Sequence, residues 1–387
     1  MIKNILLLVP NLNLGGQQQV LLRTADILKD EYNIFIAVLT MKDSVYEVHR
    51  DVIDLNIPAG KGLVMKVINI FRRVIKTRKL KRELKIDVSI SFGSTANIQN
   101  VFSKTNDKVI TSVRGYESII NSVSGKFLGH MLYSKADAVV CVSKSMSYEL
   151  ASLYRVENSK VFTVNNPYNM DELYNKSKEP VKEYDFTFPT IVTMGRMDKV
   201  KGYWHLIKAF SLVKEKHPEA RLLFIGDGKD MYKLDELVKE LNLSGSVIFA
   251  GFQKNPLKYL SKADIFVMSS IHEGFPNAMV EAMICGLPVI STDCKTGPRE
   301  ILTKDNLFKV ADEIEFGNFG VLVPPANGQE NYRADDIEQS DNFLAAAIIN
   351  LIEDPLLYKK YKDISSKRAT DFSYANYYKK IKSIIEE

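Results

Sequence analysis

The stretch Asp264-Ile-Phe-Val-Met-Ser-Ser-Ile-His-Glu-Gly-Phe-Pro-Asn-Ala-Met-Val-Glu-Ala-Met-Ile-Cys-Gly-Leu-Pro-Val-Ile-Ser-Thr-Asp-Cys-Lys-Thr-Gly-Pro-Arg-Glu-Ile-Leu302 decides the fold expected for this chain. Asp264–Met268 is a short apolar run typical of a strand buried in a parallel sheet. Glu273–Phe275 forms a turn, and a helix is expected over Ala278–Cys285, with Gly286 ending it. Leu287–Ser291 is the next strand, so the stretch predicts a strand–loop–helix–strand unit.

Two carboxylates lie eight residues apart in this unit, Glu273 in the loop and Glu281 in the helix. In an open parallel sheet, the loops that follow the carboxyl ends of the strands form the ligand crevice. The helix N-terminus offers N–H groups to a phosphate, and the carboxylates can hold sugar or ribose hydroxyls. The unit therefore suits an anionic ligand that also carries hydroxyls.

The block from Glu273 to Ala282, with Gly274, Phe275 and Asn277, resembles the Glu-x7-Glu signature of retaining glycosyltransferases of family 4. Gly286–Val289 and Gly297–Ile301 extend the resemblance. It implies an α/β protein of the GT-B fold, with a cleft between two doubly wound Rossmann-like domains. It further implies that Glu273 holds the donor sugar, that Glu281 holds the ribose of a UDP-sugar, and that Gly274, Phe275 and Asn277 border the nucleotide.

The 387 residues alternate strand and helix patterns on both sides of a polar segment, Asn175–Phe188, which reads as a linker. We expect an acceptor-binding Rossmann-like domain over 1–180 and a nucleotide-sugar-binding one over 187–360. The last helices, 361–387, are expected from the family resemblance to cross back to the first domain. The polar residues 327–341 predict an exposed insertion.

Strands and helices are predicted from these patterns as follows. Strands are expected at Ile5–Val9, Ile34–Leu39, Val88–Phe92, Lys108–Val113, Ala138–Val142 and Val161–Val164, and then at Thr190–Met194, Arg221–Ile225, Val247–Phe249, Ile265–Met268, Pro288–Ser291 and Gly320–Val323. Helices are expected at Gln17–Lys29, Val64–Leu84, Tyr203–Lys216, Lys229–Leu241 and over the tail from Asn342.

Two βα loops carry candidate phosphate-binding residues. Gly15 and Gly16 follow the first strand, where they either let the backbone approach a phosphate or form a plain turn. Arg196 and Lys201 follow the first strand of the second domain, and two such cations suit a diphosphate. Their Gly-Arg…Lys-Gly spacing resembles the family pattern, whereas Lys199 reads as a solvated loop residue. Neither a dinucleotide fingerprint nor a P-loop is present.

Further candidates come from other loops. Gly226 precedes Asp227, which either caps the next helix or contacts the ligand. Gln253 and Asn255 lie in a loop that resembles the one holding the base in the family. Arg114 is expected to face the cleft, where it can neutralise charge but not act as a base. The Gly297–Glu300 loop resembles that of galactose- and N-acetylgalactosamine-type members.

No metal or disulfide is expected from the sequence. Cys141, Cys285 and Cys294 have no metal-ligand or disulfide spacing, and they read as reduced thiols. The family resemblance implies that cationic side chains and helix dipoles replace a metal. His272 reads as a loop histidine or as a site residue. Ile5–Val9 is shorter than the apolar region of a signal peptide, and no apolar run could span a membrane.

The segment Lys61–Lys85 concentrates positive charge. Its ten cations, against the single acid Glu83, are Lys61, Lys66, Arg72, Arg73, Lys76, Arg78, Lys79, Lys81, Arg82 and Lys85. On a helical wheel, apolar residues share one broad face, and four of the cations (Lys66, Arg72, Arg73 and Lys76) lie opposite. This pattern favours a helix lying on an anionic membrane surface. The alternative is an ordinary amphipathic helix packed on the first domain; nucleic acid is disfavoured because no aromatic residues interleave the charges.

Together these features predict a retaining glycosyltransferase that moves a hexose or N-acetylhexosamine from a UDP-sugar to a glycan acceptor. The acceptor is expected to be linked to undecaprenyl diphosphate, and the enzyme to be cytoplasmic and peripheral on the inner face of the cell membrane. The alternatives are an inverting GT-B transferase, a nucleotide-sugar epimerase, or a non-catalytic scaffold that binds sugar nucleotides.

Overall fold

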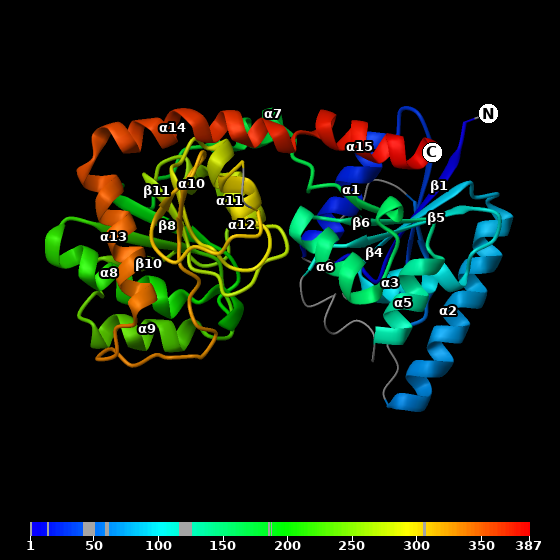
Figure 1. Ribbon diagram of the computed structural model, residues 1–387, viewed down its shortest axis with the longest axis horizontal. Helices are drawn as coiled ribbons and strands as arrows, with labels where there is room; N and C mark the ends of the chain where they lie inside the picture. The colour runs from blue at the N-terminus through cyan, green and yellow to red at the C-terminus, as the bar shows by residue number, and fades with distance from the viewer. Residues whose placement is uncertain are drawn as a thin grey trace. The chain divides into compact units, whose positions relative to one another are not determined.

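A computed structural model describes residues 2–13, 15–41, 51–58, 62–115, 126–184, 186, 188–304 and 307–387, without the side chains of Leu63 and Val64. Lys61, and residues 185 and 187 of the expected linker, lie outside this range. The chain divides into two compact units (Figure 1). Unit 1 comprises Met1–Tyr168 and Tyr374–Glu387, and unit 2 comprises Asn169–Ser373.

Unit 1 is built on a seven-stranded sheet with the order β3-β2-β1-β4-β5-β6-β7. All neighbouring strands pair in parallel. The order reverses between β1 and β4, and such a switch point opens a crevice at the carboxyl edge of a doubly wound sheet. The strands are β1 (Asn4–Val9), β2 (Asn33–Val38), β3 (Val52–Asp54), β4 (Val88–Phe92), β5 (Lys108–Val113), β6 (Ala138–Cys141) and β7 (Val161–Thr163).

Helices cover the sheet of unit 1, and the last helix of the chain is one of them (Figure 1). Tyr377, Ile381 and Ile384 of this helix are buried in the core that also contains β1 and α1. The Thr24 and Tyr377 hydroxyls hydrogen-bond at 2.8 Å. The helices are α1 (Gly16–Leu28), α2 (Leu63–Glu83), α3 (Ser94–Phe102), α5 (Lys126–Lys135), α6 (Lys144–Tyr154), the short η1 (Asn158–Lys160) and α15 (Tyr374–Glu386).

Unit 2 repeats the doubly wound plan with the order β10-β9-β8-β11-β12-β14-β13. Only the β13–β14 pair among these strands is antiparallel. The switch point lies between β8 and β11. The strands are β8 (Thr190–Met194), β9 (Arg221–Ile225), β10 (Val247–Phe249), β11 (Ile265–Met268), β12 (Val289–Thr292), β13 (Glu315–Phe316) and β14 (Val321–Val323).

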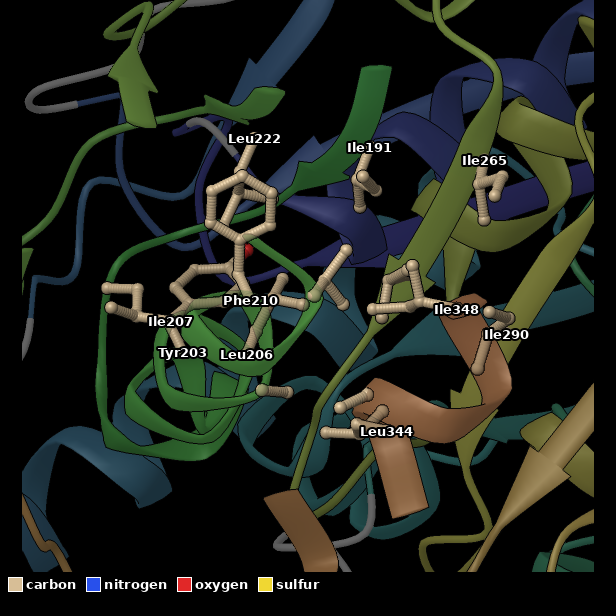
Figure 2. Close-up of a cluster of buried hydrophobic side chains, with 14 of the residues drawn as sticks. Ile191, Tyr203, Leu206, Ile207, Phe210, Leu222, Ile265, Ile290, Leu344 and Ile348 are labelled. Carbon is tan, nitrogen blue, oxygen red and sulfur yellow. The ribbon is translucent and has the colours of Figure 1, made fainter. Parts of the chain in front are cut away.

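The core of unit 2 lies between its sheet and two helices, α8 and α13. Figure 2 shows Leu206 and Phe210 of α8 and Leu344 of α13 directed toward Ile191 and Ile265 of the strands. The helices are α7 (Met170–Ser177), α8 (Tyr203–Lys216), α9 (Met231–Glu240), α10 (Leu257–Leu260), α11 (Asn277–Ile284), α12 (Pro298–Leu302), α13 (Gln339–Glu353) and α14 (Pro355–Ala369), with short η2 (Lys199–Lys201) and η3 (Thr370–Phe372).

Every predicted strand is present, with ends within one or two residues, but β3 and β13 carry no pattern that predicts them. Helices α3, α5, α6, α7, α10 and α12 are also absent from the prediction. The predicted linker is wrong over 175–177, which form the end of α7. Asn169 starts this helix because its side chain accepts a hydrogen bond from the Glu172 N–H.

The prediction that residues 327–341 form an exposed insertion is wrong for their C-terminal part. The Tyr332 ring packs against Trp204, with centroids 5.4 Å apart. The buried carboxylate of Asp341 lies 2.6 Å from Nδ1 of His205. This polar segment is therefore tied to α8 by an aromatic contact and a buried polar pair.

Helix α2 buries a polar face and exposes apolar side chains, the reverse of an ordinary amphipathic helix. Asn69, Arg73, Thr77 and Lys81, four residues apart in succession, are all buried. The prediction that Arg73 belongs to a solvated basic face is therefore wrong, as is the alternative in which the apolar face packs on the domain. Exposed side chains on the helix include Phe71 and Ile75.

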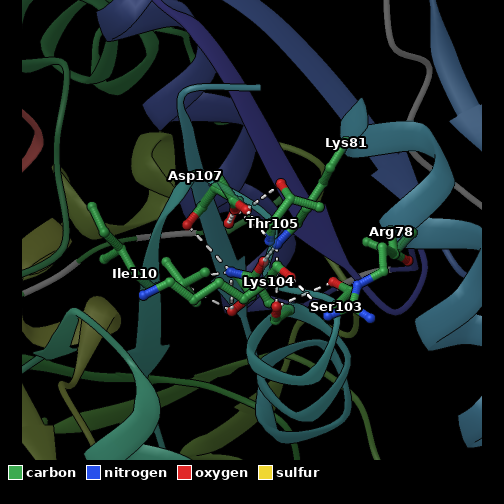
Figure 3. A network of polar contacts seen from close by, with 12 residues as sticks. Arg78, Lys81, Ser103, Lys104, Thr105, Asp107 and Ile110 are labelled. Carbon is green, nitrogen blue, oxygen red and sulfur yellow. Dashed lines mark hydrogen bonds and ion pairs between the residues drawn. The ribbon is translucent and has the colours of Figure 1, made fainter. Parts of the chain in front are cut away.

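Lys81 and Asp107 form a fully buried ion pair under α2 (Figure 3). The Lys81 ammonium lies 2.8 Å from Asp107 and donates to the Asn100 side chain at 2.7 Å. The Ser89 hydroxyl and the Thr105 N–H also donate to the carboxylate. Burial lowers the pKa of Lys81 to about 8 although Asp107 opposes this. Burial acts to raise the pKa of Asp107, but Lys81 outweighs it and the pKa is lowered.

Replacing one partner of this pair should destabilise unit 1. Lys81→Met leaves a buried carboxylate without its cation and should cost about 3–5 kcal/mol of unfolding free energy, whereas Lys81→Met with Asp107→Leu should recover most of this loss. Urea unfolding followed by circular dichroism measures both. The exposed Lys79, 3.6 Å from Glu83, provides the control Lys79→Met, with an expected loss below about 1 kcal/mol.

The stabilisation of the fold by the Lys81–Asp107 pair should depend on pH in a defined direction. A lowered Asp107 pKa stabilises the fold above about pH 4, and this contribution is lost as the pH falls through the folded-state value. The difference in unfolding free energy between the wild type and Lys81→Met should therefore become smaller below about pH 4. A single variant as stable as the wild type at neutral pH would contradict the assigned ion pair.

Candidate active site

An ion pair spans the switch point of unit 2. Lys201 comes from the loop after β8, and Glu273 from the loop after β11, the adjacent strand. Lys201 Nζ lies 2.6 Å from Glu273 Oε1, with the two side chains 21% and 11% exposed. Because the chain leaves these strands toward opposite sides, their loops border the crevice typical of doubly wound sheets. The structure thus brings together two residues that the sequence predicts for donor binding.

Hydrogen bonds hold both loops in place around this pair. The Ser270 hydroxyl donates to Glu273 Oε1 at 2.6 Å, and the Ser269 hydroxyl donates to the Lys201 carbonyl at 3.0 Å. The Thr296 hydroxyl, from the loop after β12, donates to the Glu273 carbonyl. Burial acts to lower the pKa of Lys201, but the Glu273 carboxylate outweighs it and the pKa is raised. Lys201 is therefore a fixed positive charge at neutral pH.

Arg196 supplies a second, more accessible cation. Its Nε donates to Asp198 at 2.5 Å, and its side chain is 78% exposed. The other Asp198 oxygen accepts from the Val200 N–H at 3.2 Å and so starts η2. Lys199 is exposed, in agreement with its interpretation as a solvated residue. Arg196 and Lys201 thus belong to the same short loop, and the Arg196 side chain extends into solvent whereas that of Lys201 extends toward Glu273.

Close backbone approaches bring the loops at this edge together. A Cβ on Gly226 would lie 2.0 Å from the Gly195 carbonyl oxygen, and one on Gly202 would lie 2.4 Å from that of Ser269. The loops after β8, β9 and β11 are therefore in direct contact. The interpretation of Asp227 as a helix cap is wrong, since it accepts from the N–H of its neighbour Gly228 and Asp230 occupies the cap position of α9.

Helix α11 begins immediately behind Glu273. Asn277 is its first residue and Glu281 lies about one turn in, half-buried. Gly274 leads to Phe275, whose buried ring meets Phe372 edge-on at 5.3 Å. This contact anchors the loop and fixes where the helix N-terminus lies. The positive end of the helix therefore begins four residues after Glu273 in the chain.

The candidate base-binding loop is held by its own side chains. Gln253 donates to the Ala250 carbonyl at 2.6 Å and accepts from the Tyr259 hydroxyl at 2.9 Å. Asn255 donates to the Lys176 carbonyl at 2.8 Å and accepts from the Leu257 N–H. The two side-chain amides therefore hold the shape of the loop. The groups of this loop that could contact a ligand are its main chain and the exposed side chain of Phe252.

The other predicted site residues, Gly15, Gly16 and Arg114, belong to unit 1. Gly16 begins α1 at the switch point of that sheet, preceded by Gly15. Arg114 follows β5; its Nε donates to the Ser112 hydroxyl at 2.9 Å and its Nη1 to Asn166 at 2.5 Å. Burial lowers its pKa, and the guanidinium nevertheless remains charged at neutral pH.

Several polar residues near the site are structural. Arg299, in the Gly297–Glu300 loop, is buried and pairs with Asp293 at 2.5 Å and with Glu315 at 2.9 Å, so its guanidinium holds this loop in place. His272 is exposed and its backbone bridges to Lys295. The supporting roles of Ser270 and Thr296 were not predicted, because hydroxyl residues in loops give no distinct sequence signal.

The described parts of the chain contain neither a cluster of metal-ligating side chains nor a helix suited to span a membrane. No group of three or more His, Cys, Asp or Glu side chains there could hold a metal ion. No helix in those parts is long and apolar enough to cross a membrane. The three cysteines are unbonded to one another.

Comparison with known proteins identifies the family. The family model "Glycosyl transferases group 1" matches residues 167–325, which include both members of the ion pair. An uncharacterized glycosyltransferase of Methanocaldococcus jannaschii is 33% identical over 390 residues, covering 91% of this chain and 95% of that relative. The chain belongs to the glycosyltransferases and is therefore a transferase enzyme.

Other similar proteins include a transferase of Campylobacter jejuni and solved structures of the same fold. The former, N-acetylgalactosamine-N,N'-diacetylbacillosaminyl-diphospho-undecaprenol 4-alpha-N-acetylgalactosaminyltransferase, is 27% identical over 94% of this chain and 93% of its own length. Anabaena HepE, solved with UDP and glucose, aligns with a TM-score of 0.75 at 17% identity over 99% of both chains. TarM aligns with a TM-score of 0.75 at 14% identity, over 100% of this chain and 99% of that one. The two α/β units are those of the GT-B fold.

The close approach at Gly226 should be testable by a series of alanine substitutions. Gly226→Ala places a Cβ against backbone at φ +137°, and should destabilise unit 2 by at least about 3 kcal/mol. Gly251→Ala has a φ of +66° but open space around the new Cβ, and should cost about 1–2 kcal/mol. Guanidinium unfolding followed by the fluorescence of Trp204, which is buried in unit 2, measures these losses.

Gly245→Ala is the matched control, because its Cβ would have nothing within 4 Å. We expect its unfolding free energy to differ from that of the wild type by less than about 1 kcal/mol. Equal losses for the three variants would show that the contact between the β8 and β9 loops is not tight.

Proposed function

We propose that this glycosyltransferase is a retaining enzyme of family 4 that uses a UDP-sugar donor and transfers a hexose or N-acetylhexosamine. The observation that carries the proposal is the Lys201–Glu273 pair at the switch point of unit 2, next to the N-terminus of α11. A cation and a helix N-terminus suit the diphosphate, and a carboxylate beside them suits sugar hydroxyls. We take unit 2, which contains the whole of the span 187–360, as the nucleotide-sugar-binding domain and unit 1 as the acceptor-binding one.

The main electrostatic task in this reaction is to stabilise the departing diphosphate. Lys201, Arg196 and the positive end of α11 would do so. Glu273, fixed by Lys201 and Ser270, would hold donor-sugar hydroxyls rather than attack the anomeric carbon. In a front-face displacement, the acceptor oxygen bonds to that carbon as the carbon–phosphate oxygen bond breaks. The departing phosphate oxygen then takes the proton of the acceptor hydroxyl.

The remaining predicted residues take parts in binding under this proposal. Glu281 would hold the ribose hydroxyls from one turn into α11. The main chain of 252–256 would contact the uracil edge. Gly15, Gly16 and Arg114 of unit 1 would border the phosphates and the acceptor, with Arg114 neutralising charge. No metal has a part in this scheme, since cations and helix dipoles stabilise the diphosphate.

We propose a lipid-linked glycan acceptor, as in bacterial surface polysaccharide assembly. The name of the Campylobacter relative includes a diphospho-undecaprenol. The segment Lys61–Lys85 adds a concentration of cations suited to an anionic surface. These features support a cytoplasmic enzyme held peripherally on the inner face of the cell membrane.

An inverting transferase or a nucleotide-sugar epimerase would use the same donor site. Nuclear magnetic resonance of the product decides between retention and inversion from the anomeric coupling. Sugar conversion without any acceptor would instead indicate an epimerase.

Glu273→Ala should reduce turnover by at least about a hundredfold, because it removes a contact to the reacting sugar from a ligand loop. The variant should remain folded but be less stable than the wild type, because Lys201 loses its carboxylate partner. UDP release with the acceptor measures turnover, and thermal unfolding checks the fold. Glu240→Ala, on the exposed end of α9, is the matched control and should retain activity. A folded Glu273→Ala variant with wild-type turnover would remove Glu273 from the site.

Arg196→Ala and Lys201→Ala should each weaken UDP binding by about tenfold to a hundredfold, since each loses a charge-assisted contact of about 1.5–3 kcal/mol. Uridine, which lacks the diphosphate, should bind all variants alike in calorimetry. Lys199→Ala, on the same turn but exposed, is the control. Equal losses for uridine and UDP would rule out the diphosphate role.

Transfer activity should be unchanged after treatment with EDTA, because side-chain cations and α11 stabilise the leaving group. The rate is compared before and after dialysis against the chelator. An activity that disappears and returns with magnesium or manganese would show that a metal site exists.

A further inference from the structure

Helix α2 buries a polar face. Its buried positions Asn69, Arg73, Thr77 and Lys81 follow one another at intervals of four residues and so line one side of the helix. A helix on the surface of a globular domain ordinarily buries its apolar stripe and exposes its charges. Two features of α2 therefore need a physical reason: why its polar face is buried, and why its apolar face is exposed.

The buried face is polar because it satisfies backbone and side-chain groups of unit 1. Arg73 donates twice to the Ile57 carbonyl, at 3.2 and 2.9 Å, and Asn69 donates to the Pro58 carbonyl at 3.1 Å. These carbonyls belong to the segment that follows the edge strand β3. Deeper along the helix, Thr77 accepts from Gln99, and Lys81 pairs with Asp107. This face is thus committed to the domain.

The opposite face of α2 is apolar and exposed. The side chains of Phe71 and Ile75 are each 66% exposed, and those of Val67 and Ile68 are nearly half exposed. Positions 68, 71 and 75 are spaced as neighbours on one helix face. Leaving several large apolar side chains in water costs about 1.5–3 kcal/mol each relative to burial, so a contiguous group of them marks an interaction site.

Cations border and continue this apolar stripe. Arg72 is exposed beside it, and Arg78, Lys79 and Arg82 occupy the same side one or two turns farther on. Over the whole helix, Glu83 is the only acidic residue. Apolar side chains surrounded by Lys and Arg are the pattern of helices that lie in the headgroup region of anionic membranes.

We propose that α2 docks on an anionic phospholipid surface with its outward apolar stripe, Val67, Ile68, Phe71 and Ile75, inserted among the acyl chains and its flanking cations on the lipid phosphates. This proposal rests on the peripheral location proposed above and adds the mode of binding. The polar contacts of Asn69, Arg73 and Lys81 hold the helix to unit 1, so insertion needs no rearrangement of the domain. A purely electrostatic contact would leave the apolar stripe in water.

A second copy of this chain is the other occupant to consider for the stripe. Two such helices packed face to face would bring together their rows of exposed cations, and like charges at short range oppose association. A surface of anionic lipids instead complements both the stripe and its border. Charge complementarity therefore selects the membrane.

A tryptophan placed on the stripe tests insertion. The chain contains one tryptophan, Trp204, which is 1% exposed and provides a constant background. In Phe71→Trp, we expect the emission to shift to the blue on adding vesicles of equal phosphatidylglycerol and phosphatidylcholine, and to be quenched by brominated acyl chains. Tyr148→Trp, on the exposed side of α6, is the control and should show neither change.

Paired substitutions separate insertion from charge in vesicle co-sedimentation. Phe71→Ser with Ile75→Ser should weaken binding by about tenfold for each side chain, in low and high salt alike. Arg72→Gln with Lys79→Gln should weaken it roughly fivefold for each cation, with the effect lost in high salt. Leu356→Ser, which removes an exposed leucine from α14, is the control and should bind like the wild type. Thermal unfolding confirms that every variant is folded.

Three results would overturn the proposal, and each has a different meaning. Co-sedimentation without a shift or quenching in Phe71→Trp would exclude insertion and leave a purely electrostatic peripheral enzyme. A wild type that does not co-sediment in low salt would exclude the membrane location itself. A blue shift that depends on protein concentration without vesicles would identify a second copy as the occupant. None of these results affects the UDP-binding and turnover measurements that test the transferase site.

Discussion

The ion pair between Lys201 and Glu273 depends on one constraint, the reversal of strand order between β8 and β11. Parallel strands end at the same edge of a sheet, and only at a reversal do two neighbouring loops turn away from each other. The cation and the carboxylate come from these two loops, 72 residues apart in the chain. If the two side chains did not meet, each charge would lie largely buried without an ionic partner, which would lower the stability of unit 2. The donor site proposed here is therefore built into the topology of unit 2.

The supporting contacts make the pair rigid. Hydroxyls of Ser270 and Thr296 hold the Glu273 loop, and the ring of Phe275 fixes the start of α11. Gly226 permits the β8 and β9 loops to touch, because any side chain there would meet a carbonyl oxygen. Electrostatic stabilisation of a leaving group depends on charges and dipoles that are positioned before the reaction. The rigidity of these loops is what would allow Lys201 and α11 to act in this way.

Helix α2 shows that an amphipathic pattern does not by itself say which face is buried. The periodicity of its apolar residues correctly predicts a helix over nearly the same span, Leu63–Glu83. The face that packs on unit 1 is nevertheless the polar one, since the carbonyls after β3 and the buried Asp107 need donors. Satisfying buried polar groups outweighed the burial of Phe71 and Ile75. Those two side chains are thereby left for another surface.

The sequence by itself determined every strand except β3 and β13, the longest helices and the doubly wound class, because buried parallel strands are short runs of β-branched residues. The block from Glu273 to Glu281 and the pair Arg196 and Lys201 also predict which loops form the proposed donor site, and the comparisons bear out the glycosyltransferase family. Short elements such as β3 and α7 escaped prediction, since they are stabilised by contacts distant in sequence. Only the tertiary structure decided that Lys201 pairs with Glu273, that Arg299 is a buried structural residue, and that α2 faces outward with its apolar side. Each of these depends on which partner lies nearby in space, and a local pattern of residues carries no information about that partner.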